Sequence, residues 1–190
     1  MTCTSKTLSW IMIPMVLGFF LGSIMVQTHL DVSTPLATVN PAGTAGAALI
    51  VYHPGFSDFN EQVAMAYAAG LESADWVIHL SSASHQAPTD LKEYELLVLA
   101  APTYAWKPAS PVLRFVDRCG DFAGLPTVLI LTAAGSSEAA AAVLSDAVTA
   151  ANADIVDVLE VWQAAPNEEV HGIPDAMEIA RRAGAAISIP

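Results

Sequence analysis

The chain has 190 residues, which is enough for one domain with a buried core plus a short additional segment. It carries 19 acidic and seven basic residues, giving a formal net charge of −12 at neutral pH. This acidic balance argues against nucleic acid as a partner and against docking on anionic lipid through the domain surface. The two cysteines, Cys3 and Cys119, show no C-x-x-C spacing and indicate neither a metal site nor a compartment.

The N-terminal part of the chain contains a long apolar segment. Leu8 to Val26 reads LSWIMIPMVLGFFLGSIMV and has no charged residue. As a helix it would cover about 28 Å, close to the ~30 Å hydrocarbon core of a bilayer. A cleaved signal peptide is the alternative, but the segment is long and no A-x-A pattern follows it. The sequence therefore predicts an N-terminal flank at 1–7 and one transmembrane anchor at 8–27.

The basic residues around this segment favour one orientation of the anchor. Lys6 precedes it, and the next basic residue in the chain is Lys92. The positive-inside rule then places the N-terminus inside and the rest of the chain outside. We therefore expect a single-pass membrane protein whose domain lies on the extracytoplasmic side, with the membrane as one partner.

A change of composition separates the apolar segment from the remaining chain. Residues 31–46 read DVSTPLATVNPAGTAG, are rich in Pro, Thr, Ala and Gly, and show no apolar periodicity. Such a composition is typical of a linker. We assign residues 28–46 to a flexible linker and residues 47–190 to one domain.

The domain alternates short apolar runs with helix-like segments. Continuous apolar runs rich in β-branched residues predict strands that are covered on both faces. The strands are expected at 47–52, 75–80, 95–100, 127–132 and 155–161. Helical patterns are expected at 58–71, 111–118, 138–151 and 175–184, the first with Asp58 as its N-cap and Glu61 three residues later. Alternation of this kind predicts an α/β fold with a doubly wound, five-stranded parallel sheet.

Ligands of such sheets bind beyond the carboxyl ends of the strands, where the strand order reverses. Three loops leave carboxyl ends here: HPGFS at 53–57, PTYAWKP at 102–108 and TAAGSS at 132–137. We expect these loops to form the functional edge of the sheet. No general base, nucleophile motif or metal-binding spacing stands out, so the sequence predicts no catalytic residue of its own.

Two stretches resemble the flavodoxin family. YELLVLAAPTYAWKPASPVLRFVDR at 94–118 is similar to the family's Y-D-x-hydrophobic-G-S-P-T-Y-x-G-x-P-x-x-P-V-x-x-F-L, and GLPTVLILTAAGSSEAAAAVLSDAV at 124–148 is similar to its G-K-P-V-x-L-F-x-T-x-G-S segment. The resemblance covers about residues 46–187. It implies a flavodoxin-like sheet with strand order 2-1-3-4-5, preceded here by one transmembrane helix, and non-covalent binding of FMN.

The resemblance also implies the residues of the FMN site. Tyr104 and Trp106 would flank the flavin ring, although either aromatic could instead pack against a neighbouring helix. The first loop departs from the family's Ser/Thr-x-Thr-Gly-x-Thr, because Pro54 removes a donor and Asp58 places a negative charge at the expected phosphate position. The implied FMN-binding residues are His53, Gly55, Ser57, Asn60, Pro102, Thr103, Tyr104, Ala105, Trp106, Thr132, Gly135 and Ser136.

Two functions of different classes are consistent with these residues. The first is a membrane-tethered flavoprotein that binds FMN for electron transfer or for quinone or flavin redox chemistry, with a redox protein or a quinone as partner. The second is a flavodoxin-fold binding or assembly module that has lost FMN. The intact aromatic loop favours the first function, and the altered phosphate loop favours the second.

Overall fold

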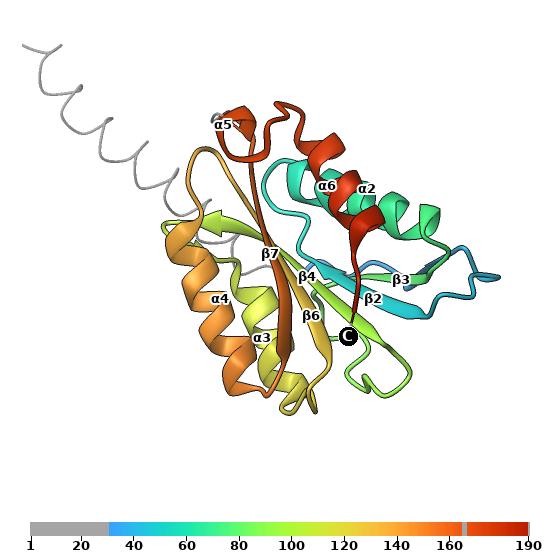
Figure 1. Ribbon diagram of the computed structural model, residues 1–190. Coiled ribbons are helices and arrows are strands. Elements are labelled where there is room, and N and C mark those ends of the chain that lie inside the picture. The colour runs from blue at the N-terminus through green and yellow to red at the C-terminus, as the bar shows by residue number, and fades with distance from the viewer. Residues whose placement is uncertain (1–30, 165–166, 190) are drawn as a thin grey trace, which may run out of the picture.

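A computed structural model describes residues 31–164 and 167–189 of the chain. Figure 1 shows a twisted sheet with helices on both faces. The elements are β1 (Ala37–Val39), β2 (Ala47–Tyr52), α2 (Phe59–Ser73), β3 (Val77–Ser82), β4 (Leu96–Tyr104), β5 (Lys107–Pro108), α3 (Ser110–Cys119), β6 (Pro126–Ala133), α4 (Glu138–Ala150), β7 (Asp154–Trp162), α5 (Asn167–His171) and α6 (Ala176–Ala186).

The sheet is mostly parallel, as the sequence predicts. Its strand order is β1-β3-β2-β4-β6-β7, and β5 pairs only with β4. The neighbours among β3, β2, β4, β6 and β7 are all parallel. The observed order differs from the expected five-stranded one by two short antiparallel additions, β1 beside β3 and β5 beside β4.

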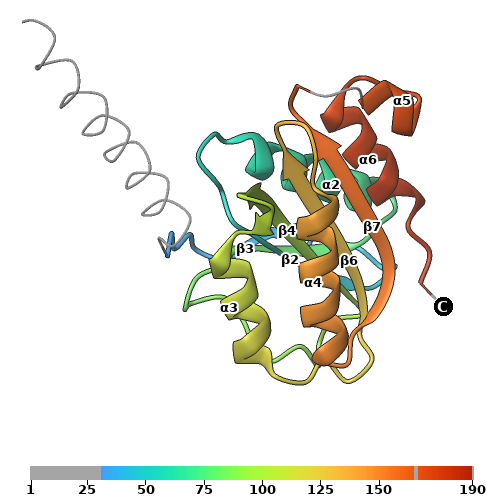
Figure 2. The ribbon, with the colours of Figure 1, turned by 90° about the vertical axis from the view of Figure 1, so that its left-hand side faces the viewer.

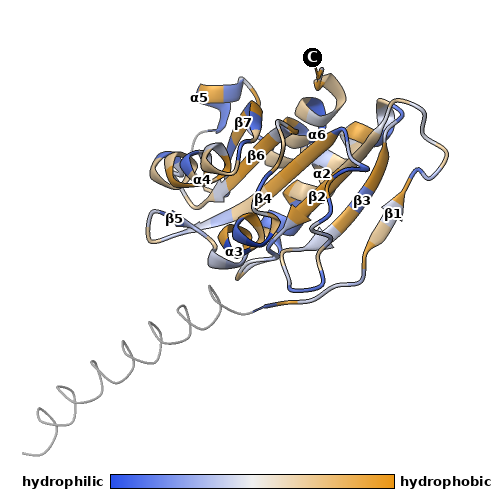
Figure 3. Cartoon of the chain, turned by 90° about the horizontal axis from the view of Figure 1, so that it is seen from below, coloured by the Kyte–Doolittle hydropathy of each residue, from blue (hydrophilic) through white to orange (hydrophobic). Residues whose placement is uncertain are grey.

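The central strands form because their side chains are covered on both faces of the sheet. Residues 48–52 of β2 and 96–102 of β4 are buried, which matches their continuous apolar sequences. Successive side chains alternate between the faces, so the strands contribute to two separate cores. In Figure 3 the central strands are among the most hydrophobic parts of the described chain.

The first core lies between the sheet and the helices α2 and α6, which run side by side in Figures 1 and 2. Their contact is close because each helix presents a glycine to the other. A Cβ atom built on Gly70 would lie 2.2 Å from the Arg181 carbonyl oxygen, and one on Gly184 would lie 2.3 Å from the Tyr67 carbonyl oxygen. Any larger residue at either position would push the helices apart.

The second core lies under α3, α4 and the connection between β3 and β4. This connection, residues 83–95, contains no helix. Its apolar side chains Ala83, Ala87 and Leu91 nevertheless pack with Phe115 of α3 on the same face of the sheet. The connection is also tied to α3, because Arg118 Nη2 donates a hydrogen bond of 2.5 Å to the Ser84 carbonyl.

The segment expected to be a flexible linker is partly ordered. Residues 37–39 pair with β3, and Val39 packs against the first core. The following turn is fixed by Asp75, whose carboxylate accepts hydrogen bonds from the Thr44 hydroxyl (2.6 Å) and the Thr44 amide (3.2 Å). The linker assignment of 28–46 therefore departs from the structure over its second half, because this part covers the open edge of β3.

The expected membrane localisation is corrected by the structure. Within residues 31–164 and 167–189, no helix has both the length and the apolar character needed to cross a bilayer. The expected flank 1–7 and transmembrane anchor 8–27 lie outside the described residues, and the expected extracytoplasmic side of the domain depended on that anchor. The expected membrane partner and the expected extracytoplasmic placement therefore have no support in the described residues.

Candidate functional site

The carboxyl ends of β2, β4 and β6 meet at one edge of the sheet. The chain passes from β2 outward to β3 and then back across to β4, so the strand order reverses between β2 and β4. A cavity of about 260 Å³ lies at this edge. This is the position at which open α/β sheets bind ligands.

Six of the twelve residues expected from the sequence line this cavity. They are Ser57, Asn60, Pro102, Thr103, Tyr104 and Thr132. Five lining residues were not expected, and these are Phe56, Phe59, Ala133, Ala134 and Gln163. The first four of them are adjacent in sequence to expected residues, but Gln163 follows β7, and no sequence pattern indicated a site at the end of that strand.

The other six expected residues do not line the cavity; they are His53, Gly55, Ala105, Trp106, Gly135 and Ser136. Gly55 lies close to it, since a Cβ atom there would be 3.1 Å from Tyr104 Oη and 3.4 Å from Pro102 Cγ. Gly55 has a φ of 87°, which favours glycine. His53 is buried, at 2% exposure, below the loop.

Asn60 connects the strands β2, β4 and β6 beneath the cavity. Its Nδ2 donates hydrogen bonds to two backbone carbonyls, that of His53 directly after β2 (2.7 Å) and that of Ala100 within β4 (3.1 Å). Its Oδ1 accepts a hydrogen bond of 2.9 Å from the Thr132 hydroxyl of β6. Asn60 is 1% exposed, so its amide group holds the floor of the site together.

The loop after β2 is closed by Tyr104. The Phe56 amide donates a hydrogen bond of 2.7 Å to Tyr104 Oη. Burial raises the pKa of the Tyr104 phenol, an effect that the hydrogen bond from Phe56 partly offsets. The hydroxyl is therefore protonated near neutral pH, and it holds the first loop against the end of β4. The side chain of Phe56 itself is 59% exposed.

The predicted capping arrangement at the start of α2 is absent. Asp58 precedes the helix but forms no side-chain hydrogen bond to it, and its carboxylate is exposed. Glu61 does not reach back to the cap, because its Oε1 accepts a hydrogen bond of 3.1 Å from the Tyr52 hydroxyl. The helix N-terminus therefore carries two acidic residues, Asp58 directly before the helix and Glu61 in its first turn.

The stretch expected to be a simple loop after β4 is a β-hairpin. Thr103 pairs with Pro108 and Tyr104 pairs with Lys107, which leaves Ala105 and Trp106 as the two turn residues. Both have positive φ angles, 47° and 63°, as in the primed turns of two-residue hairpins. Trp106 is 75% exposed, so the expected flanking of one ligand by Tyr104 and Trp106 is not formed in this conformation.

Thr103, one of the residues that line the cavity, has an unsatisfied hydroxyl. Its Oγ1 is buried and has no hydrogen-bond partner among the described residues. A buried polar atom without a partner is costly, and native structures contain few of them. This atom is therefore suited to a polar group supplied by a ligand.

The loop after β6 is fixed by β7. The Ser137 hydroxyl donates a hydrogen bond of 2.6 Å to Glu160 and accepts one of 3.0 Å from the Trp162 indole. These contacts hold the small residues 133–136 at the edge of the cavity. Their small side chains leave the backbone open to a ligand edge.

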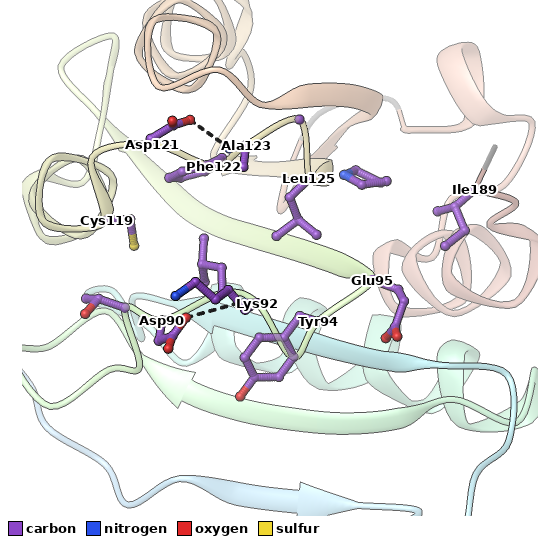
Figure 4. Close-up of a pocket in the computed structure, with 14 residues that line it drawn as sticks. Asp90, Lys92, Tyr94, Glu95, Cys119, Asp121, Phe122, Ala123, Leu125 and Ile189 are labelled. Atoms are coloured by element: carbon purple, nitrogen blue, oxygen red, sulfur yellow. Dashed lines mark hydrogen bonds between the residues drawn. The ribbon is translucent and has the colours of Figure 1, made fainter.

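A larger cavity, of about 620 Å³, lies at the opposite edge of the sheet, where β4 and β6 begin (Figure 4). Two of its carboxylates are engaged with the protein: Asp121 accepts from the Ala123 amide (2.8 Å), and Asp90 accepts from the Lys92 amide (3.3 Å). Burial raises the pKa of the Cys119 thiol there to about 11, so it is no nucleophile at neutral pH. Size alone does not make this the functional site, because ligands of this architecture bind at the carboxyl edge.

Comparison with known proteins decides the fold. An archaeal flavodoxin aligns with a TM-score of 0.56 and 20% identity, covering 73% of this chain and 94% of its own. The chain has a flavodoxin-like fold. The flavodoxin of Streptococcus pneumonia TIGR4 aligns with a TM-score of 0.57 and 14% identity, covering 74% of this chain and 99% of its own.

A third structure with this flavodoxin-like fold is described as an enzyme. It is the NAD(P)H:quinone oxidoreductase of Methanothermobacter marburgensis, with a TM-score of 0.53 and 15% identity, covering 75% of this chain and 96% of its own. No family model and no curated protein sequence matches the chain. The resemblance in the sequence is thus confirmed at the level of the fold.

Proposed function

We propose that the chain is a redox protein that holds a flavin ring non-covalently at the carboxyl edge of β2, β4 and β6. The supporting observation is the unsatisfied hydroxyl of Thr103, a residue that lines the cavity at the point where the strand order reverses. Flavin rings carry carbonyl and ring-nitrogen groups along one edge, and such groups can pair with a hydroxyl. A bound flavin would supply the electron-accepting ring itself.

The other lining residues suit a planar aromatic ligand. Phe56 of the first loop, Phe59 at the start of α2 and Tyr104 at the end of β4 contribute aromatic surface, and aromatic contacts add about 0.5–1.5 kcal/mol beyond simple burial. No described lining residue is charged. These residues would bind and orient the ring and exclude water from one side of it, while the strongly acidic surface would select basic or neutral redox partners. FMN, a redox protein and a quinone remain the proposed ligand and partners.

The test uses the purified full-length chain titrated with FMN and, separately, with riboflavin. Flavin fluorescence should be quenched on binding, because stacked aromatic side chains quench it. Replacement of Thr103 by Val keeps the side-chain shape and removes the hydroxyl, and it should weaken binding roughly 2- to 10-fold. Thr149→Val, at an exposed position of α4, is the matched control. Absence of quenching and of binding heat with either flavin at millimolar concentration would disprove the proposal.

A binding module without flavin is the second candidate. It is favoured by the hydrogen bond from Phe56 to Tyr104, which closes the first loop against the end of β4. This candidate is the one that stands if neither flavin binds.

A further inference from the structure

We infer that the site selects a flavin without a phosphate group, of the riboflavin type, over a phosphorylated one such as FMN. The inference rests on the proposed function, since it concerns which flavin the same cavity takes. It follows from the hydrogen-bond donors and the charges around the first loop and the start of α2.

A phosphate bound at a loop and helix N-terminus needs several free N–H or O–H donors. In this loop three of the six positions from 54 to 59 offer no free backbone N–H. Pro54 has no N–H, the Phe56 N–H donates to Tyr104 Oη at 2.7 Å, and the Phe59 N–H donates to the Ser57 carbonyl. Three of the amides that could surround a phosphate are thus absent or engaged.

The side-chain donors are depleted in the same way. Both hydrogens of the Asn60 amide are used by the carbonyls of His53 and Ala100. The Thr132 hydroxyl donates to Asn60 Oδ1. Ser57 keeps an exposed hydroxyl, and this is fewer donors than the Ser/Thr-x-Thr-Gly-x-Thr pattern provides.

The charges at this position repel a phosphate. The exposed carboxylate of Asp58 lies directly before α2, and Glu61 follows in the first turn. These acidic groups already interact with the partial positive charge of the helix N-terminus, which would otherwise attract a phosphate. Among the described residues that line the cavity there is no lysine or arginine. The hairpin that contains Tyr104 carries one cation, Lys107, which is exposed and pairs with Tyr104 across the hairpin.

The size of the cavity agrees with this selection. Its 260 Å³ lies just below the about 300–1,000 Å³ typical of small-molecule sites. A cavity of this size accommodates a ring better than a whole nucleotide, and the chain beyond the ring would extend into solvent past Ser57 and Asp58. An uncharged chain tolerates this path, whereas a phosphate meets the Asp58 carboxylate.

The experiment measures the dissociation constants of riboflavin and of FMN for the full-length chain by fluorescence quenching and calorimetry, at low and at high salt. Riboflavin should bind more tightly than FMN at low salt. Salt should strengthen FMN binding and leave riboflavin binding unchanged, because it screens the repulsion. Asp58→Asn should tighten FMN binding roughly 3- to 10-fold and leave riboflavin unchanged. Asp146→Asn, which removes an exposed carboxylate from α4, should change neither.

The outcomes separate this inference from the proposed function. FMN binding that is as tight as riboflavin binding, or tighter, would overturn the inference and leave the proposed function standing. A loss of FMN affinity alone in Lys107→Gln would also overturn it, because a cation would then be holding the phosphate. If neither flavin binds, the proposed function fails and the inference fails with it.

Discussion

Asn60 of α2 and Thr132 of β6 are separated by 72 residues in the sequence and joined by a buried hydrogen bond of 2.9 Å. The same Asn60 side chain also holds the carbonyls of His53 and Ala100. One amide group therefore connects the strands β2, β4 and β6 under the candidate site. Its loss would affect both the stability of the fold and the shape of the cavity.

Replacement of Asn60 by Ala should lower the free energy of unfolding by about 2–4 kcal/mol, because buried carbonyls lose their donor. Urea denaturation of the full-length chain measures this. Gln62→Ala removes an exposed amide from the same helix and should cost less than about 0.5 kcal/mol. Equal losses in the two variants would contradict the role assigned to Asn60.

Replacement of Gly70 or Gly184 by Ala should destabilise the chain by roughly 1–3 kcal/mol or more, because the new methyl group meets the backbone of the facing helix. Intrinsic helix propensity alone would predict the opposite sign, a gain of up to about 1 kcal/mol per substitution. Thermal unfolding distinguishes the two results. An increase in Tm in either variant would show that α2 and α6 can separate without loss.

Alkylation of Cys119 should be slow at neutral pH. Burial raises its pKa to about 11, and the nearby Arg118 charge only partly opposes this. About one thiol in ten thousand is then ionised at pH 7, and the rate with iodoacetamide should rise about tenfold per pH unit up to pH 10. The measurement uses a Cys3→Ser variant so that one thiol reacts. A plateau below pH 9, as expected in urea, would contradict the burial.

The turn before β2 should loosen in acid. Hydrogen bonds from the Thr44 hydroxyl, then from Asn40 and the Thr44 amide, lower the pKa of Asp75 below its usual value of 3.8. The stabilisation is therefore present above about pH 4 and is lost as the pH falls through the lowered pKa. Thr44→Val should move this pKa back up, which NMR titration of the Asp75 carboxyl measures. An unchanged pKa in this variant would contradict the assignment.

The sequence predicted the parallel strands well because each is a continuous apolar run buried on both faces. AALIVY is found as β2 with the predicted bounds. The hairpin between β4 and β5 could not be predicted in the same way, because its turn residues Ala105 and Trp106 are neither Gly nor Asn. The three-residue β1 is too short to show a periodic pattern, and its pairing depends on the open edge of β3.

The candidate site was predictable in position but not in detail. The three loops at the carboxyl ends meet at one cavity because parallel strands end at the same edge. The Asn60 amide group forms hydrogen bonds with Ala100 and Thr132, which are 40 and 72 residues away, so local sequence cannot predict these bonds. The closure of the first loop by Tyr104 likewise depends on two segments 48 residues apart.

The connection between β3 and β4 gives the molecule an uneven resistance to local opening. Residues 83–95 bury apolar side chains against the sheet but lack the repeating amide–carbonyl ladder that protects α2, α3, α4 and α6. Backbone amides without such a ladder exchange with solvent through small openings rather than through global unfolding. Deuterium should therefore enter residues 83–95 long before it enters β2 and β4 beneath them. We expect local unfolding to begin at this connection, whose residues 84–86 contact Asp31 and Ser33 in the segment before the edge strand β1.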